Sequence, residues 1–204
     1  NDAVKEDIEA SEPDYQRVIG SPGSDLYGFV VIDSFVSGRG TGGIRCTDSV
    51  TLDEVSRLAR EMTYKFAFLH LPSGGAKAGL VAPADITGTA REALFHRFGE
   101  AIGDLLRNGK YVGGLDMGTG PGDILALNAG AGVHASPGHQ DSDIDSNYYT
   151  ALTAFATVQA MLEARGRAMQ DTRVLVEGVG KVGSHLLSLL GNAGARVVGV
   201  STLD

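Results

Sequence analysis

Apolar residues recur along the chain with two different periods, and these periods predict where strands and helices lie. Residues 26–35 read LYGFVVIDSF, an apolar and β-branched run that predicts a strand. From Thr51 the spacing becomes helical, and Thr51 with Glu54 has the spacing of a capping box. The sequence therefore predicts a helix after Thr51, with an apolar face made of Val55, Leu58, Ala59, Met62 and Phe66.

A second helix lies between two further predicted strands. Residues 79–83 can form a returning strand, and 89–109 repeat the helical pattern with Thr89 and Glu92 as a second capping box. The segment KYVGGLD then predicts a short strand that places Asp116 at its carboxyl end, where open α/β sheets form their sites. The apolar face of this helix comprises Phe95, Phe98, Ile102, Leu105 and Leu106.

A polar stretch, SPGHQDSDIDSN, separates the chain into two parts. We expect one domain at 1–145, and a linker helix with a second, truncated domain at 146–204. A long helix is predicted at 149–165, and the following segment has the order strand, glycine turn, helix and strand. The predicted fold class is α/β: an N-terminal domain with a mixed sheet and helices, followed by an incomplete Rossmann (doubly wound) domain.

Composition excludes several classes of function. The 204 residues are 43% hydrophobic and 21% charged, which is enough to bury a core. The net charge of −8, without any basic run, argues against nucleic-acid or membrane partners. The single cysteine, Cys46, excludes an internal disulfide and a cysteine-based zinc site. No apolar run approaches the roughly 20 residues that span a bilayer, and we expect a cytoplasmic protein.

The clearest motif is GVGKVG, which follows an apolar strand and precedes an apolar helix. That context favours a dinucleotide-binding turn, in which backbone amides at a helix N-terminus hold a pyrophosphate. The alternative is an ordinary glycine-rich turn between a strand and a helix. The candidate cofactor-binding residues of the motif are Gly178, Gly180, Lys181, Val182 and Gly183.

An acidic residue that holds the ribose hydroxyls is expected about 20 residues further on. Thr202 stands nearest to that place, and Asp204 lies slightly late. We therefore predict NAD as the cofactor, with NADP possible.

Two lysines, twelve residues apart, stand in unusual surroundings. Lys65 falls on the apolar face of its predicted helix, and Lys77 lies in SGGAKAGL, among glycines and alanines. A desolvated lysine loses its proton more readily, so Lys77 is a candidate base. The alternatives are a Lys65 side chain that reaches solvent from the core edge and a Lys77 on a surface loop.

Asp116, flanked by glycines at a strand end, is the third candidate. Alone it is more often a turn residue than a catalyst, but with both lysines nearby it would complete a charged triad suited to proton transfer. The five histidines show no metal-ligand spacing, and no G-x-S-x-G elbow is present. We assign no metal site and no serine hydrolase chemistry.

The segments GGIRCTDSVTLDEVSRLAREMTYKFAFLHLPSGGAKAGL, DMGTG and VEGVGKVG resemble the amino-acid dehydrogenase family that includes glutamate, leucine, phenylalanine and valine dehydrogenases. The resemblance covers nearly the whole chain from about Leu26. It implies NAD(P)-dependent oxidative deamination of an L-amino acid to a 2-oxo acid and ammonium, in a homo-oligomer. Because the chain ends after two Rossmann strands, we expect it to be the N-terminal portion of such an enzyme.

The resemblance implies that 1–145 is the substrate-binding and catalytic-lysine domain and that 146–204 is a linker helix plus a truncated Rossmann dinucleotide-binding domain. It also implies roles for individual residues. Lys65 would bind the substrate carboxylate together with the backbone of Gly42 and Gly43. Lys77 would activate water against the imine carbon, and Asp116 would shuttle protons to and from the departing nitrogen.

Three further positions bear on cofactor and substrate. Thr150 aligns with a threonine that contacts the nicotinamide amide, although the glycine that usually follows it is absent. Lys181 replaces the usual asparagine of the glycine motif. Thr41 stands where glutamate dehydrogenases usually carry a lysine, so we expect an apolar or small side chain on the substrate rather than that of glutamate.

Two alternatives to the dehydrogenase remain open. The chain could be a catalytically silent short homologue that acts as a regulatory or assembly subunit, which would not need to bind nucleotide. A lysine Schiff-base enzyme would suit Lys77, but it leaves the dinucleotide motif unexplained.

Overall fold

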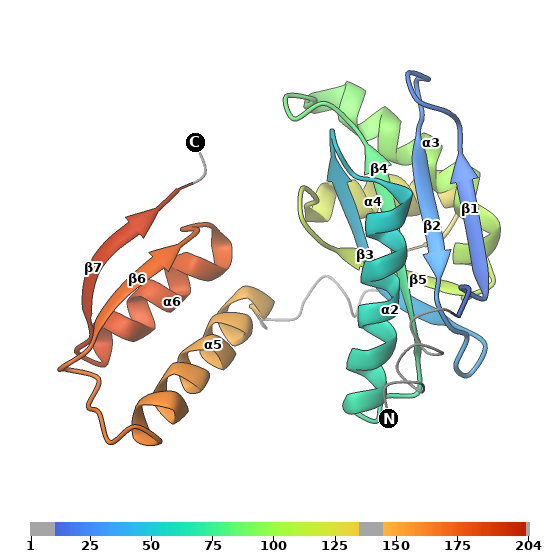
Figure 1. Cartoon of the computed structure of the whole chain (residues 1–204). Helices are drawn as coiled ribbons and strands as arrows, with labels where there is room; N and C mark the ends of the chain where they lie inside the picture. Colours follow the sequence, from blue (N-terminus) through green and yellow to red (C-terminus); the bar gives the residue numbers. More distant parts are fainter. Residues whose placement is uncertain (1–10, 135–144, 203–204) are drawn as a thin grey trace. The chain divides into compact units, whose positions relative to one another are not determined.

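The computed structural model describes residues 11–134 and 145–202. The chain divides into two compact units, Asn1–Ala135 (unit 1) and Ser136–Asp204 (unit 2), and each is described here by itself. Element labels are those of Figure 1.

Unit 1 is built on a mixed five-stranded sheet with the strand order β1-β2-β4-β3-β5. Strands β3, β4 and β5 are parallel to one another, whereas β2 runs antiparallel to both β1 and β4. This arrangement confirms the predicted mixed sheet. The strands are β1 (Tyr15–Ile19), β2 (Gly28–Ile32), β3 (Gly40–Thr47), β4 (Gly74–Val81) and β5 (Tyr111–Leu115).

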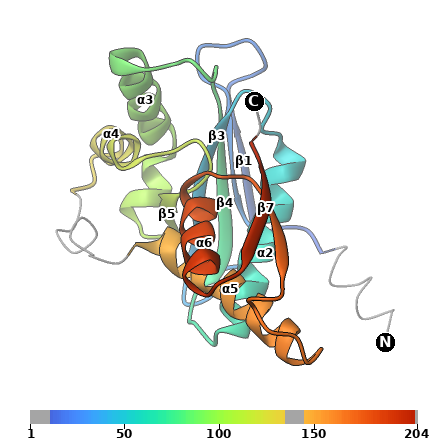
Figure 2. The ribbon, with the colours of Figure 1, turned by 90° about the vertical axis from the view of Figure 1, so that its left-hand side faces the viewer.

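Helices cover both faces of this sheet, as Figures 1 and 2 show. Helix α2 (Leu52–Phe68) lies on one face, while α3 (Gly88–Arg107) and α4 (Pro121–Ala131) lie on the other. The larger core cluster lies under α3 and α4, and a smaller one lies under α2. Because both faces are covered, every residue of the apolar strand β2 is buried.

The helix predictions hold in most respects. The Thr51 hydroxyl accepts a hydrogen bond from the Glu54 amide, so α2 begins where the capping pattern predicts. The predicted capping box at Thr89 is wrong, because α3 already begins at Gly88 and Thr89 lies inside its first turn. The predicted apolar face of α3 is confirmed by its buried residues Phe95, Phe98, Ile102 and Leu105.

The glycine-rich segments differ most from expectation. The strand predicted at 79–83 begins five residues earlier, so β4 includes Lys77, and β3 includes the GTGG segment that glycine content alone would make flexible. Pairing on both sides stabilises these strands despite their weak intrinsic preference. The pattern analysis also missed β1 and α4.

Unit 2 contains a long helix and a strand–helix–strand segment. Helix α5 (Ser146–Glu163) corresponds to the helix predicted at 149–165. Strand β6 (Arg173–Glu177), helix α6 (Lys181–Asn192) and strand β7 (Arg196–Ser201) follow in the predicted order, with β6 and β7 parallel. Most of the polar stretch between the two units lies outside the described residues.

Candidate active site

Lys77 is buried in the middle of β4, in a strand rather than in the turn or loop that its glycine-rich context suggests. Only 6% of its surface is exposed. Its strand neighbours Ala76 and Ala78 point into the larger core, so Lys77 faces the opposite side, which carries α2. The small residues of β4 allow this close approach, since a Cβ at Gly75 would overlap the backbone of Thr63 on α2.

Asp116 follows the last residue of β5 and is fixed by a tight turn. Its backbone amide donates to the Thr119 hydroxyl at 2.8 Å, and that hydroxyl donates back to the Asp116 carbonyl at 2.9 Å. Gly118, with φ of 75°, closes the turn, and the Met117 carbonyl accepts from Cys46 on β3. The carboxylate is thereby anchored beside the parallel strand β3, at the predicted carboxyl end of a strand.

The two predicted catalytic residues meet. Lys77 Nζ lies 3.0 Å from Asp116 Oδ2, and Arg45 Nε donates to the same oxygen at 2.9 Å. Arg45 also forms an ion pair with Glu54 on α2. Within the described parts of the chain, no donor contacts the second oxygen, Oδ1. The result is a partly buried cluster of two cations and two carboxylates.

The surrounding charges control the ionisation of Asp116. Burial opposes ionisation, but the hydrogen bonds and charges of Lys77 and Arg45 outweigh it, so the pKa of Asp116 lies below its ordinary value. Asp116 is therefore ionised at neutral pH. It can accept a proton through Oδ1 while Oδ2 stays bound to the cations.

The backbone of Gly42 and Gly43 lies beside this cluster, in β3. The buried Tyr111 hydroxyl donates to the Gly42 carbonyl at 3.0 Å. Burial, and secondly the charge of Asp116, raise the pKa of Tyr111, so it stays a donor. A Cβ at Gly43 would lie 2.8 Å from the Asp116 Cβ, which is closer than real side chains approach. Only glycine therefore fits at position 43 beside Asp116.

Lys65 does not join the cluster. It lies in the last turn of α2 and is exposed, and among the described residues its side chain makes no hydrogen bond or ion pair. The prediction of an ammonium on the buried face of α2 is wrong, because the buried stripe passes through Val55 and Ala59. The second cation beside Asp116 is Arg45.

Thr41 lies on the same face of β3 as Arg45, since the two are separated by an even number of residues. Its hydroxyl is 2.7 Å from the hydroxyl of Ser73, the residue before β4. At this position the chain therefore presents two paired hydroxyl groups and no cation.

The glycine motif in unit 2 has the predicted strand–turn–helix form. Gly178 has φ of 84°, a value that L side chains rarely adopt, and its amide donates to the Ser201 carbonyl at the end of β7. A Cβ at Gly183 would overlap the Gly178 carbonyl, whereas one at Gly180 would meet nothing within 4 Å. The turn is thus closely packed inside and open at Gly180, which fits the approach of a pyrophosphate.

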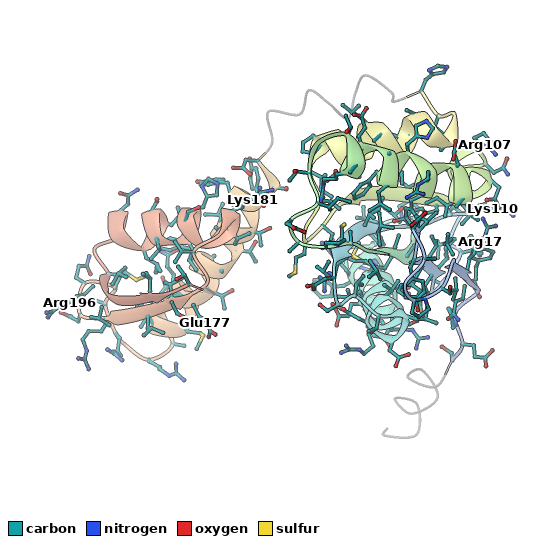
Figure 3. All side chains as sticks on the ribbon, turned by 90° about the horizontal axis from the view of Figure 1, so that it is seen from above. Arg17, Arg107, Lys110, Glu177, Lys181 and Arg196 are labelled. Carbon is teal, nitrogen blue, oxygen red and sulfur yellow. The ribbon has the colours of Figure 1, made fainter. Side chains whose placement is uncertain are left out.

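The other predicted cofactor residues lie in unit 2 as well. Lys181 and Val182 begin α6 directly after the N-cap residue Gly180. Figure 3 labels Lys181 together with Glu177, the last residue of β6 on the other side of the turn. Thr202 follows β7, and the Thr150 hydroxyl donates to the Ser146 carbonyl within α5. Asp204 lies outside the described residues.

Arg45 is the functional residue that sequence reasoning missed. Its signal is weak, since an arginine alternating with buried residues in a strand is usually a solvated side chain. Only its distance from Asp116, 71 residues away in sequence, shows that it belongs to the site.

Neither a metal site nor a membrane helix appears in the described part of the chain. No group of three or more His, Cys, Asp or Glu residues there is placed to hold a metal ion. No helix within 11–134 and 145–202 has the length and apolar character that crossing a bilayer requires.

Comparison with known proteins identifies the family of the chain. Residues 23–129 match the family model described as Glu/Leu/Phe/Val dehydrogenase, dimerisation domain, and residues 143–204 match the model of the Glutamate/Leucine/Phenylalanine/Valine dehydrogenases. The chain belongs to the Glu/Leu/Phe/Val dehydrogenase family. The predicted family and the predicted α/β fold class are therefore confirmed.

Relatives of this family member include two curated proteins. The NADP-specific glutamate dehydrogenase of Synechocystis sp. is 32% identical over 80% of the chain, and the NAD-specific glutamate dehydrogenase A of Halobacterium salinarum is 29% identical over 83%. The chain spans 41% of the length of each.

The fold of the chain is also similar to that of a solved glutamate dehydrogenase structure. The hetero-hexameric glutamate dehydrogenase of Thermus thermophilus, in its Leu-bound form, superposes with a TM-score of 0.78 at 25% identity. The match covers 93% of this chain and 50% of that chain.

Proposed function

We propose that the chain is the part of an NAD(P)-dependent L-amino-acid dehydrogenase that carries the catalytic lysine, the proton-transferring aspartate and the dinucleotide turn. The observation that carries this proposal is the partly buried ion pair between Lys77 and Asp116, at 3.0 Å, in a chain that also has a formed glycine turn. The relatives named above use NAD or NADP, and we propose the same cofactors here.

The side chains have complementary tasks in such a reaction. A bound NAD(P) supplies the acceptor for the hydride that leaves the substrate Cα. Lys77 Nζ takes a proton from the water that attacks the resulting imine carbon, and its burial keeps competing water away. Asp116 carries a proton to the departing nitrogen through its open oxygen Oδ1. Lys65 and the backbone at Gly42 and Gly43 bind the substrate carboxylate.

Replacing Lys77 tests the mechanism. In the protein that contains this chain, Lys77→Met removes the base but keeps an unbranched apolar side chain, and we expect turnover to fall by roughly 10²–10⁴-fold. Lys110→Met, at an exposed lysine labelled in Figure 3, is the matched control and keeps full activity. The assay is the absorbance of NAD(P)H formed with a panel of amino acids. Undiminished turnover in Lys77→Met would refute the proposal.

For the substrate, we propose an amino acid with an apolar or small side chain. The Thr41–Ser73 hydroxyl pair supports this, because it offers no cation for a second carboxylate. The glutamate dehydrogenases among the relatives favour glutamate instead.

Assays of the unchanged protein and of Thr41→Lys with both kinds of amino acid test whether the substrate is apolar or is glutamate. With a cation added, kcat/KM for glutamate should rise at least about tenfold, and kcat/KM for apolar amino acids should fall. Thr41→Ser keeps a hydroxyl and is the matched control. If the unchanged protein already uses glutamate best, the substrate proposal fails and the dehydrogenase proposal stands.

A second candidate is a catalytically silent subunit that regulates or assembles with an active one. The hetero-hexameric relative, which contains more than one kind of chain, is the observation that favours it. Its signature would be assembly with another dehydrogenase chain and no nucleotide binding by this one. We propose a homo-oligomer, supported by the dimerisation domain matched at 23–129.

A further inference from the structure

The proposed role of Lys77 as a base conflicts with its contact to the Asp116 carboxylate. A base must release its proton, yet an ammonium 3.0 Å from a carboxylate is stabilised in its charged form. If Lys77 were the only cation beside Asp116, losing its proton would leave a half-buried carboxylate without a counter-ion. The site therefore needs a second source of positive charge.

Arg45 supplies that charge at the same atom. Its Nε donates to Asp116 Oδ2 at 2.9 Å, so the oxygen that binds Lys77 keeps a cation when Lys77 becomes neutral. A guanidinium does not lose its proton at any pH at which proteins work. We propose that Arg45 is a positioning residue that serves as the permanent counter-ion of Asp116, so that Lys77 can release its proton. This inference rests on the proposed function of Lys77 as a base.

Glu54 completes the arrangement. It lies in the first turn of α2 and forms an ion pair with the terminal nitrogen Nη1 of Arg45, while Nε donates to Asp116. The guanidinium is thus held from two sides, by a helix on one face of the sheet and by the turn after β5. This fixed geometry leaves Asp116 Oδ1 available for proton transfer.

Among the described residues, no other ion pair is formed by Lys77 or Asp116. The strand partner of Lys77 on β2 is Val31, and the titratable group that β5 contributes is the buried Tyr111. The positive charges of Arg45 and Lys77 contribute to keeping the pKa of Asp116 low, although burial opposes them. With Arg45 present, the loss of one cation therefore leaves the carboxylate ionised.

The decisive experiment measures the protonation of Lys77 without requiring turnover. Trace acetylation with acetic anhydride labels only neutral amines, and mass spectrometry quantifies the label at Lys77 across pH. In Arg45→Met, Lys77 becomes the sole counter-ion, so its labelling at a fixed pH should fall by at least about tenfold. Arg45→Lys keeps a cation and should restore much of the original profile.

Two controls accompany this variant. Arg57→Met changes an exposed arginine on α2 and should leave the Lys77 profile unchanged. The exposed Lys65 serves as an internal reference, and its labelling should be the same in every variant. An unchanged Lys77 profile in Arg45→Met would overturn the proposal.

Glu54→Gln provides a second test if Arg45→Met does not fold. The amide oxygen can still accept the hydrogen bond from Arg45, but one negative charge is lost, so the cluster becomes more positive. The labelling of Lys77 at a fixed pH should then rise, opposite to the effect of Arg45→Met. A fall or no change in labelling would contradict the counter-ion role.

Kinetics separate this inference from the proposed function. If the enzyme turns over amino acids, Arg45→Met should lower kcat/KM more strongly at acid pH than at alkaline pH, and it should lower kcat more than it raises KM. A shifted labelling profile in a protein without turnover would overturn the proposed function alone. Normal turnover with an unshifted profile would overturn the role of Arg45 alone.

Discussion

The two units hold their functional residues in different ways. In unit 1, the Lys77–Asp116–Arg45 cluster joins β4, the end of β5 and β3, and it lies against a sheet covered on both faces. In unit 2, the glycine turn is formed within one strand–turn–helix segment, residues 173–192. Its described core is sparse, with buried apolar residues Ala151, Leu162, Val176 and Leu190.

This difference separates positioning by packing from positioning by local backbone geometry. The first site depends on strands that are far apart in sequence but lie side by side in the sheet. Core substitutions far from the charged cluster should therefore change its geometry. The second depends on φ angles and close backbone contacts over a dozen residues. Substitutions of the same kind should therefore have very different effects in the two units.

Adding one methyl group to a strand glycine should produce the largest difference. Gly42→Ala places a Cβ onto the Ala76 carbonyl of the neighbouring strand, and we expect a loss of at least about 4 kcal/mol in the stability of unit 1. In unit 2, Gly191→Ala in α6 meets nothing within 4 Å and should gain about 0.5–1 kcal/mol. Hydrogen exchange with mass spectrometry reports each unit separately. Equal effects would refute the contrast.

Core truncation comes next. Phe98→Ala removes a fully buried ring of the larger core, and we expect a loss of about 3–5 kcal/mol in unit 1. Leu175→Ala, at a side chain 69% exposed on β6, should change stability by no more than about 0.5 kcal/mol. Urea unfolding monitored by hydrogen exchange measures both. A small loss in Phe98→Ala would show that the core of unit 1 collapses around the cavity.

The acid dependence of stability should differ between two carboxylates whose pKa values are both lowered, Asp116 and Asp145. The stability from ionised Asp116 is fully present above its ordinary pKa of 3.8 and is lost as pH falls through the lower folded-state value. Asp116→Asn should therefore destabilise unit 1 by about 1–3 kcal/mol at pH 7, and this difference should vanish in acid.

Asp145→Asn is the matched variant in unit 2. Asp145 caps α5 and lies 2.8 Å from His185, but asparagine also caps a helix and both partners are exposed. Its effect should disappear in high salt, whereas that of Asp116→Asn should persist. Unfolding curves at low and high salt, from pH 3 to 7, distinguish the two. Equal salt sensitivity would contradict the partial burial of the Asp116 cluster.

The smallest effect concerns single hydroxyl groups. Tyr111→Phe removes the buried donor to the Gly42 carbonyl and should cost about 1 kcal/mol. Thr153→Val removes an exposed hydroxyl that donates to a carbonyl within α5, where water can replace it, so little change is expected. Melting curves of the two variants provide the test. A neutral Tyr111→Phe would show that the Gly42 carbonyl does not need this donor.

Much of the local structure is predictable from the sequence. Helical spacing and the Thr51 cap locate α2, and four of the five residues predicted for the apolar face of α3 are buried, while Leu106 is partly buried. Prediction fails where glycine dominates, because β3 and β4 are stabilised by neighbouring strands rather than by their own preference. It also fails at Lys65, since helical spacing cannot tell which part of an apolar stripe the sheet covers.

The sequence by itself determined the longer helices, the glycine turn and two residues of the site, because periodicity, capping and backbone sterics act over a few neighbouring positions. Only the tertiary structure decided which charges meet. The parallel register of β3 with β4 and β5 brings Arg45 and Lys77 to one oxygen of Asp116, across 71 residues of sequence in the case of Arg45. Coulomb interactions depend on distance in space, and strand pairing sets that distance.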